Sequence, residues 1–286
     1  MMDTTLLDNK KELSCGPYRL NLSEKTFIMG ILNLTPDSFS DGGKFNHIDA
    51  ALAHAEVMIS EGADIIDVGG ESTRPGAKYV DAAEEIKRVV PVIEKLSKVI
   101  NVPISIDTYK ADVAEQAILA GATIINDVWG AKADPNMAAV AAKYNVPIVL
   151  MHNRPKRNYG SLISDMIADL NESVEIVKRA GVQDDKIILD PGIGFAKTME
   201  DNLVVMRNLE TFSQLGYPVL LGTSRKTFIG RILDLPPSDR MEGTGATVCL
   251  GIEKGCSIVR VHDVQGIARM AKMMDAMLGK GAAVHG

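Results

Sequence analysis

The stretch Ile187-Ile188-Leu189-Asp190-Pro191-Gly192-Ile193-Gly194-Phe195 contains the pattern from which the fold is predicted. Three apolar residues lead into a carboxylate, and Pro191 and Gly192 then end the run. A short apolar run bounded by turn residues is typical of a buried parallel strand. A carboxylate at its exit lies where α/β barrels place their chemistry. Asp190 alone could equally cap the next helix, so the prediction depends on how often the pattern recurs.

Seven further apolar runs end in polar or glycine-rich exits in the same way. They span residues 26–32, 63–68, 104–106, 123–125, 147–151, 218–221 and 258–261. Segments of helical periodicity separate them, among them residues 48–60, 81–98, 111–120, 163–180 and 266–278. Eight strands alternating with eight helical segments predict a single-domain α/β fold, the (β/α)8 TIM barrel. A doubly wound open sheet is the alternative, but no Gly-x-Gly-x-x-Gly turn follows the first strand.

Residues 1–25 precede the first predicted strand and are mixed and polar. They lack the apolar core of a signal peptide, and no shift in composition interrupts the chain after them. We therefore expect an N-terminal extension over residues 1–25, covering one end of the barrel. A single catalytic domain is expected over residues 26–286.

The composition argues against several classes of protein. The chain has 286 residues, is 46% hydrophobic and carries a net charge of −6, so it has no basic field to bind nucleic acid. No apolar run reaches the roughly 18 residues of a membrane span. Its three cysteines do not have the spacing of metal ligands. We therefore expect a protein of the reducing cytoplasm that acts on small molecules.

In a closed barrel all strand exits converge on one end, which would form a pocket. The side chains expected to share it are Asn33, Thr73, Arg74, Asp107, Asn126, Met151, Asp190, Phe195, Lys226, Arg260 and His262.

Part of this set suits a flat ring with several N–H donors, such as an aminopyrimidinone. Asp107, Asn126 and Asp190 can hydrogen-bond to the edge of such a ring. Arg260 can stack on its face, because guanidinium is planar. Lys226 can donate to a ring oxygen, and Schiff-base formation is its rival role.

The rest of the set suits an anion. Arg74, Arg260 and His262, with the N-terminus of the last helix, can bind a phosphate group. Asn33 offers a hard oxygen to a magnesium ion that also takes substrate phosphates.

Other residues are expected to have structural roles. Asp67 lies inside a strand and should be a satisfied barrel carboxylate, and Asp127 should cap a helix. His152 is either a solvated loop residue or a functional one. Four residues at helical spacing are expected to pack against the core: Met270, Met273, Met274 and Met277.

Seven ordered motifs closely resemble those of the dihydropteroate synthase family: GILNLTPDSFSDGG, GADIIDVGGESTRPGA, SIDTYKADVAEQAI, INDVWG, ILDPGIGFAK, GTSRKTFIG and VRVHDV. The likeness runs from about Phe27 to Met277. It implies a bacterial TIM-barrel transferase of folate biosynthesis, the target that sulfonamides inhibit. Such enzymes join 6-hydroxymethyl-7,8-dihydropterin diphosphate to p-aminobenzoate, giving 7,8-dihydropteroate and pyrophosphate. The resemblance also implies a homodimer, for which the Met-rich last helix is one candidate surface.

The resemblance assigns roles to individual residues. The implied pterin site comprises Thr73, Asp107, Asn126, Met151, Asp190, Phe195, Lys226 and Arg260. The implied diphosphate site comprises Asn33, Arg74, Arg260 and His262, with Asn33 as the ligand of Mg²⁺. The implied p-aminobenzoate site comprises Phe39, Pro75, Lys226 and Thr227. Thr227 stands where the family more often has serine, and its hydroxyl is retained. The residues expected to be catalytic are Asp107, Asp190, Lys226 and Arg260.

The expected reaction is a dissociative substitution. Pyrophosphate leaves first, and Asp107 and Asp190 stabilise the pterin cation that remains. Three other functions stay open: a methyltransferase that passes a methyl group from a folate to a corrinoid, an aldolase that uses Lys226, and a pterin-binding protein without catalysis. The presence of Asn33, Arg74 and His262 favours a diphosphate substrate.

Overall fold

The structure is a computed structural model that describes residues 12–34, 44–72 and 78–281. Its first two strands are β1 (Glu12–Cys15) and β2 (Tyr18–Asn21). The remaining strands are β3 (Phe27–Asn33), β4 (Ile65–Gly69), β5 (Ile104–Asp107), β6 (Ile124–Asp127), β7 (Ile148–Met151), β8 (Ile187–Asp190), β9 (Leu220–Leu221) and β10 (Ile258–Val261). The helices are α2 (Lys44–Ser60), α3 (Ala82–Val99), α4 (Ala111–Ala120), α5 (Met137–Tyr144), α6 (Leu162–Arg179), α7 (Met199–Arg207), α8 (Leu209–Ser213), α9 (Thr227–Leu233), α10 (Met241–Glu253) and α11 (Val264–Met277). The short 3₁₀ helices are η3 (Asp184–Lys186) and η4 (Pro237–Asp239).

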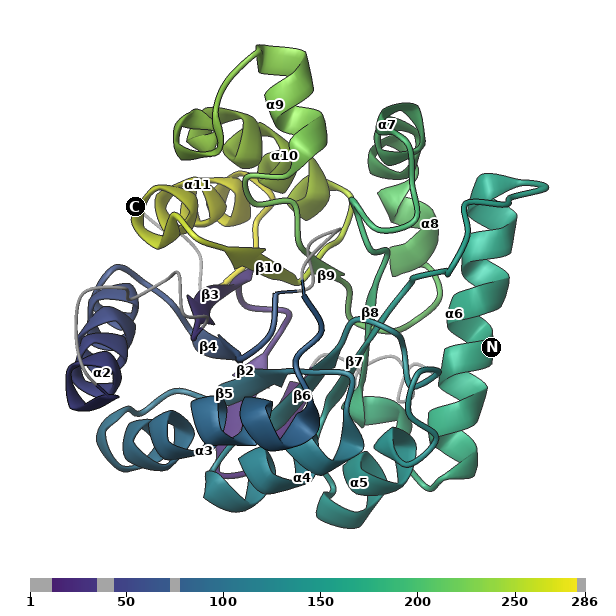
Figure 1. Ribbon diagram of the computed structural model, residues 1–286. Helices are drawn as coiled ribbons and strands as arrows, with labels where there is room; N and C mark the ends of the chain where they lie inside the picture. Colours follow the sequence, from purple (N-terminus) through teal and green to yellow (C-terminus); the bar gives the residue numbers. More distant parts are fainter. Residues whose placement is uncertain (1–11, 35–43, 73–77, 282–286) are drawn as a thin grey trace.

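Strands β3 to β10 form an eight-stranded parallel sheet in the order β8-β7-β6-β5-β4-β3-β10-β9. A parallel bridge between Leu189 in β8 and Val219, the residue before β9, joins the two edges of the sheet and closes the barrel. Helices surround the sheet (Figure 1). The predicted TIM barrel is confirmed, and each predicted strand is found with bounds shifted by a few residues. The strand predicted at residues 218–221 is shortened most, because β9 has only 2 residues.

Helix α3 illustrates how local sequence sets the bounds of the outer helices. The Asp81 side chain accepts a hydrogen bond from the backbone N–H of Glu84 at 2.8 Å and caps the first turn. Val89, Ile93 and Leu96 follow at spacings of three and four residues and are buried on one face of the helix. The periodicity therefore directs one side of the helix to the barrel.

Among the described residues, no helix combines the length and the apolar character needed to cross a membrane.

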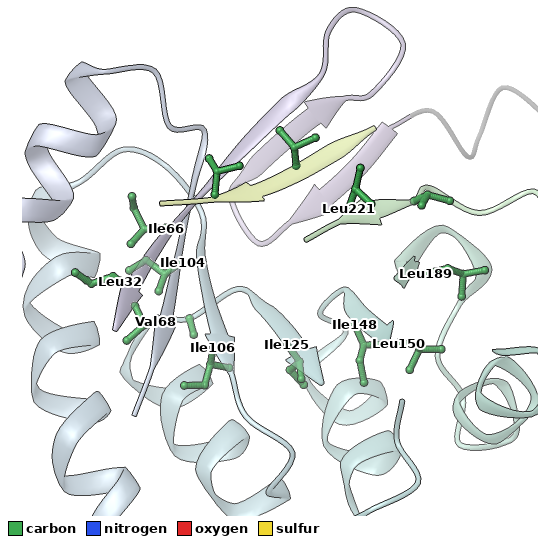
Figure 2. Close-up of a cluster of buried hydrophobic side chains, with 14 of the residues drawn as sticks. Leu32, Ile66, Val68, Ile104, Ile106, Ile125, Ile148, Leu150, Leu189 and Leu221 are labelled. Atoms are coloured by element: carbon green, nitrogen blue, oxygen red, sulfur yellow. The ribbon is translucent and has the colours of Figure 1, made fainter. Parts of the chain in front are cut away.

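Successive strand side chains point to opposite faces, and this alternation produces two hydrophobic layers. The outward layer packs against the helices and includes Leu32, Ile66, Val68, Ile104, Ile106, Ile125, Ile148, Leu150, Leu189 and Leu221 (Figure 2). The inward layer fills the amino-terminal half of the barrel and comprises Phe27, Met29, Ile65, Ile124, Val149, Ile188, Leu220 and Ile258.

The hairpin formed by β1 and β2 covers the amino-terminal end of the barrel. Its Leu13, Cys15 and Leu20 are buried in one cluster with the inward layer. Lys186, in η3, donates from Nζ to the carbonyl oxygen of Ser14 at 2.6 Å and ties the hairpin to the turn before β8. This end of the barrel is therefore a packed core, which leaves the carboxyl end for a ligand.

The alternation also determines which polar side chains point inward at the carboxyl end. Asp67, Asn126, Met151, Asp190 and Arg260 each follow an inward apolar residue by two positions along their strands. They form the next layer above the apolar one. Sequence alternation thus places these residues of different strands in one compartment.

The packing prediction for the C-terminal methionines is only partly right. Met270 and Met274 pack against the outer core. Met273 and Met277 are 59% and 61% exposed, so the prediction is wrong for these two residues. They lie four positions apart on the face of α11 that points away from the barrel.

Leu13→Ala should lower the free energy of unfolding by about 2–5 kcal/mol, because it opens a cavity in the inward core. Leu119→Ala, at a side chain that is 62% exposed on α4, is the control and should change stability by less than about 0.5 kcal/mol. Urea denaturation measures both. Equal, small effects would mean that the hairpin adds no stability to the barrel.

Candidate functional site

The Arg260 guanidinium organises the carboxyl end of the barrel. It reaches from β10 past β3, donating from Nε to Asp67 Oδ2 at 2.6 Å and from Nη2 to Asp107 Oδ2 at 2.5 Å. The Asn126 amide donates to the same Asp67 oxygen at 3.2 Å. Side chains from β4, β5, β6 and β10 are therefore joined in one network inside the barrel.

Two buried carboxylates share this one guanidinium, which leaves the network short of hydrogen-bond donors. Asp67 is fully buried and Asp107 is 6% exposed. The second oxygen of each, Oδ1, is buried without a hydrogen-bond partner among the described residues. An unsatisfied buried acceptor costs free energy, so these oxygens suit a ligand that brings N–H groups. Burial raises the pKa of Asp107 to about 7; Arg260 opposes this shift and Asp67 adds to it.

Asp190 ends β8 and begins a tight turn. Its Oδ1 accepts a hydrogen bond from Gly192 N at 2.7 Å. Gly192 has φ +65°, and a Cβ there would overlap the carbonyl oxygen of His152, so only glycine suits this position. Burial raises the pKa of Asp190, and the nearby Lys226 opposes the shift.

Lys226 approaches the same turn from the N-terminus of α9. Its Nζ donates to the carbonyl oxygen of Ile193 and lies 4.7 Å from the centroid of the Phe195 ring. Burial lowers the pKa of Lys226 to about 8, with Asp190 acting in the opposite direction. The loop that carries Asp190 and Phe195 is therefore also the loop that holds Lys226.

A serine that the sequence did not single out orients His262. Ser224 Oγ is 2.9 Å from His262 Nδ1 and accepts from the His262 backbone N–H at 3.0 Å. These bonds join the exits of β9 and β10. The only sequence signal for Ser224 was its place within the GTSRKTFIG motif.

Asn33 lies at the exit of β3, close to Asp107. A Cβ built on Gly69 would be 3.8 Å from Asn33 Oδ1 and 3.7 Å from Asp107 Oδ2, so the two side chains flank the same glycine. The described residues contain no group of three or more His, Cys, Asp or Glu side chains that could hold a metal. Mg²⁺ takes oxygen ligands and is usually held by few protein groups together with substrate phosphates, and the Asn33 amide oxygen is a ligand of this type.

The structure locates most of the predicted site residues at this end. Met151 is buried at the end of β7, and Thr227 is exposed at the start of α9. Four predicted residues lie outside the described residues: Phe39, Thr73, Arg74 and Pro75.

The residues expected to be structural have mixed outcomes. Asp127 caps a turn and not the helix that was predicted, accepting from Trp129 N at 2.8 Å and from Ala131 N at 2.7 Å. Asp67 is ion-paired as expected, but its second oxygen has no hydrogen-bond partner in the described part of the chain, so Asp67 belongs to the site network. The alternation from Ile65 was the signal that could have identified it. The solvated alternative for His152 is wrong, because its side chain is buried.

Comparisons with known proteins agree on one family. The model of a pterin binding enzyme matches residues 29–262. The dihydropteroate synthase of Bacillus subtilis (strain 168) is 67% identical over 280 residues, which cover 98% of this chain and 98% of that protein. A crystal structure of a Clostridium difficile dihydropteroate synthase in the presence of pteroic acid has a TM-score of 0.89 and 52% identity, covering 90% of this chain and 98% of that one. A Xanthomonas albilineans dihydropteroate synthase with 4-aminobenzoic acid has a TM-score of 0.90 and 38% identity, covering 94% and 98%.

The raised pKa of Asp107 predicts a pH-dependent difference in stability between the natural chain and Asp107→Asn. A carboxyl whose pKa is higher in the folded state than in the unfolded state, about 7 against 3.8, stabilises the fold at low pH and loses this contribution as pH rises towards 7. The natural chain should therefore lose at least about 1 kcal/mol relative to Asp107→Asn between pH 4 and pH 8, since one pKa unit is about 1.4 kcal/mol. Urea denaturation across this range measures the difference. A constant difference would mean that Asp107 is ionised throughout.

Proposed function

This chain belongs to the dihydropteroate synthase family of pterin-binding enzymes, and from that membership we propose that it joins 6-hydroxymethyl-7,8-dihydropterin diphosphate to p-aminobenzoate. The products are 7,8-dihydropteroate and pyrophosphate, which makes the protein a transferase of folate biosynthesis. The observation that carries the proposal is the pair of carboxylate oxygens beside Arg260 that have no hydrogen-bond partner within residues 12–34, 44–72 and 78–281. A pterin edge brings N–H donors of the kind these oxygens need.

We assign the pterin to the interior network. Asp107, Asn126 and Asp190 bind the ring edge, and Lys226 donates to the ring oxygen. Arg260 stacks on the ring, because the two carboxylates fix the plane of its guanidinium. The other pterin contacts are Thr73, Met151 and Phe195, of which Thr73 is assigned from the sequence resemblance.

We assign the diphosphate to Asn33, Arg74, Arg260 and His262, with Arg74 placed by the sequence resemblance. When the Ser224 hydroxyl donates to Nδ1, the hydrogen of a neutral His262 ring is on Nε2, from which it can be donated to an anion. Magnesium bound through Asn33 would add positive charge at the diphosphate oxygens. The p-aminobenzoate contacts are assigned by resemblance to Phe39, Pro75, Lys226 and Thr227.

The reaction we propose is a dissociative substitution. The bond between the pterin methylene carbon and the diphosphate oxygen breaks, and its electron pair leaves with pyrophosphate. The methylene cation is delocalised over the ring, where Asp107 and Asp190 stabilise it more than the neutral substrate. The arylamine nitrogen then forms the new C–N bond and loses one proton. No step requires a covalent bond to Lys226. In the structure its Nζ donates a hydrogen bond to the Ile193 carbonyl oxygen.

We further propose that the protein is a cytoplasmic homodimer. The family resemblance supports the dimer, and the free thiols of Cys15, Cys249 and Cys256 support a reducing compartment. Sedimentation of the purified protein tests whether it is a dimer.

A reaction with labelled p-aminobenzoate and the pterin diphosphate tests the proposed activity. Dihydropteroate and pyrophosphate should appear in equal amounts, and chelation of Mg²⁺ should abolish turnover, because the diphosphate would lose much of its charge stabilisation. Borohydride should trap no adduct at Lys226. Absence of product together with a reduced adduct at Lys226 would support the aldolase, and methyl transfer from a folate to a corrinoid would support the methyltransferase.

Asp190→Asn should weaken pterin binding by tenfold or more, about 1.4 kcal/mol. The NH2 group of the asparagine would face an N–H donor of the ring. Two buried donors that face each other without an acceptor cost about 1–3 kcal/mol. The remaining oxygen can still accept from Gly192 N, so the turn should be kept. Calorimetry measures the affinity, with the exposed Asp112→Asn on α4 as the control. Unchanged affinity in Asp190→Asn would remove Asp190 from the pterin site.

A further inference from the structure

A buried lysine without an assigned substrate contact holds the loop that follows β8. Lys197 is 7% exposed. Its Nζ lies 2.9 Å from the carbonyl oxygen of Gly192, 3.0 Å from that of Phe195 and 3.0 Å from Nδ1 of His152. An ammonium group has three N–H donors, so these three acceptors satisfy it completely.

The protonation of His152 is set from its other side. His152 Nε2 is 3.0 Å from Asp169 Oδ2, and Arg154 donates to the same oxygen at 2.5 Å. Burial raises the pKa of Asp169, but the Arg154 hydrogen bond outweighs this and holds that pKa below its usual value. Asp169 is therefore an acceptor only, so Nε2 carries the ring hydrogen. Burial and the charge of Lys197 lower the pKa of His152 to about 3, so the neutral ring accepts from Lys197 through Nδ1.

The loop between Asp190 and Lys197 needs contacts of this kind. Gly192, Gly194 and Ala196 have φ values of +65°, +87° and +47°. A left-handed conformation is unfavourable for alanine and persists only where surrounding contacts enforce it. The loop conformation therefore depends on contacts made to it from outside.

The same loop positions the proposed pterin contacts. Ile193 lies between the two carbonyls that Lys197 holds, and its own carbonyl accepts from Lys226 Nζ. The Phe195 ring lies beneath the same Nζ, and Gly192 N donates to Asp190 Oδ1. One ammonium group thus holds the Gly192 and Phe195 carbonyls, and another binds the Ile193 carbonyl between them.

We infer that Lys197 is a positioning residue for the pterin site, acting through the Gly192 and Phe195 carbonyls. By holding them it sets the positions of Asp190, Phe195 and Lys226. The inference rests on the proposed function, because it assigns the loop to a pterin site.

Protonation of Lys197 should matter for this role. Burial lowers the pKa of Lys197 to about 7, and Asp190 acts in the opposite direction. Above that pH the neutral amine keeps two donors, and its lone pair would meet that of His152 Nδ1, so the loop should be held less firmly. The charged or titratable groups around it are His152 after β7, Asp169 on α6, Asp190 on β8, Asp201 on α7 and Lys226 before α9.

The test compares Lys197→Met with Lys186→Met in the full chain. Lys186 is also 7% exposed and also donates to a backbone carbonyl, that of Ser14 at 2.6 Å, but at the opposite end of the barrel. Calorimetry with 6-hydroxymethylpterin measures Kd, and urea denaturation measures stability. Lys197→Met should raise Kd at least tenfold, whereas Lys186→Met should lower stability and change Kd less than twofold. Equal changes in Kd would overturn the inference, because any loss of a buried lysine would then suffice.

Two further comparisons separate positioning from general destabilisation. His152→Asn keeps an acceptor near the place of Nδ1 and should retain most of the pterin affinity, whereas His152→Leu should not; this pair also serves if Lys197→Met does not fold.

Lys226→Met should raise Kd more than tenfold in the natural chain but less than threefold in the Lys197→Met background. Independent effects of the two lysines would overturn the inference. If the natural chain itself does not bind the pterin, the proposed function fails; if it binds and Lys197→Met binds equally well, only this inference fails.

Discussion

The barrel encloses one guanidinium between two buried carboxylates, and the carboxyl end of the fold depends on this arrangement. Burying Asp67 and Asp107, and partly burying Arg260, has a large desolvation cost that their attraction offsets only with good hydrogen-bond geometry. The bonds of 2.6 and 2.5 Å provide that geometry for one oxygen of each carboxylate. The other oxygen of each carboxylate has no hydrogen-bond partner among the residues that the structure describes. Apolar residues could fill this space with less cost to stability, so the cluster is best explained by a ligand that completes it.

The apolar layer below this cluster excludes water and so strengthens the electrostatic interactions within it. Ile65 and Asp67 are two positions apart on β4, as are Ile258 and Arg260 on β10, so the interior changes from apolar to charged within one layer of side chains. Electrostatic interactions are stronger where water is excluded. The hairpin contributes to this because Leu13 helps to cover the amino-terminal end. The part of the barrel that stabilises the fold therefore also sets the electrostatic environment of the site.

The strands were predictable because buried parallel strands appear as short apolar runs, and the carboxylate at the exit of β8 was predictable because it ends such a run. Period-two alternation along β4 could also have identified Asp67. Alternation carries no information about loops, and this is why the contacts of His152 and Lys197, which join loops after β7 and β8, were not predicted. Helical spacing has a similar limit. It places Met273 and Met277 on one face of α11 but does not tell whether that face is covered.

Hydrogen-bond satisfaction separates two kinds of cation in this barrel. Arg260 binds carboxylates whose second oxygens have no hydrogen-bond partner in the described part of the chain, so a molecule that brings donors would complete its network. Lys197 has three donors and three acceptors, all within the protein, so its network has no place for a ligand. Both lie near Asp190, and burial perturbs the pKa of titratable groups in each network. A perturbed pKa alone would therefore assign both to the chemistry. The count of donors against acceptors instead assigns Arg260 to binding and Lys197 to holding the loop on which binding depends.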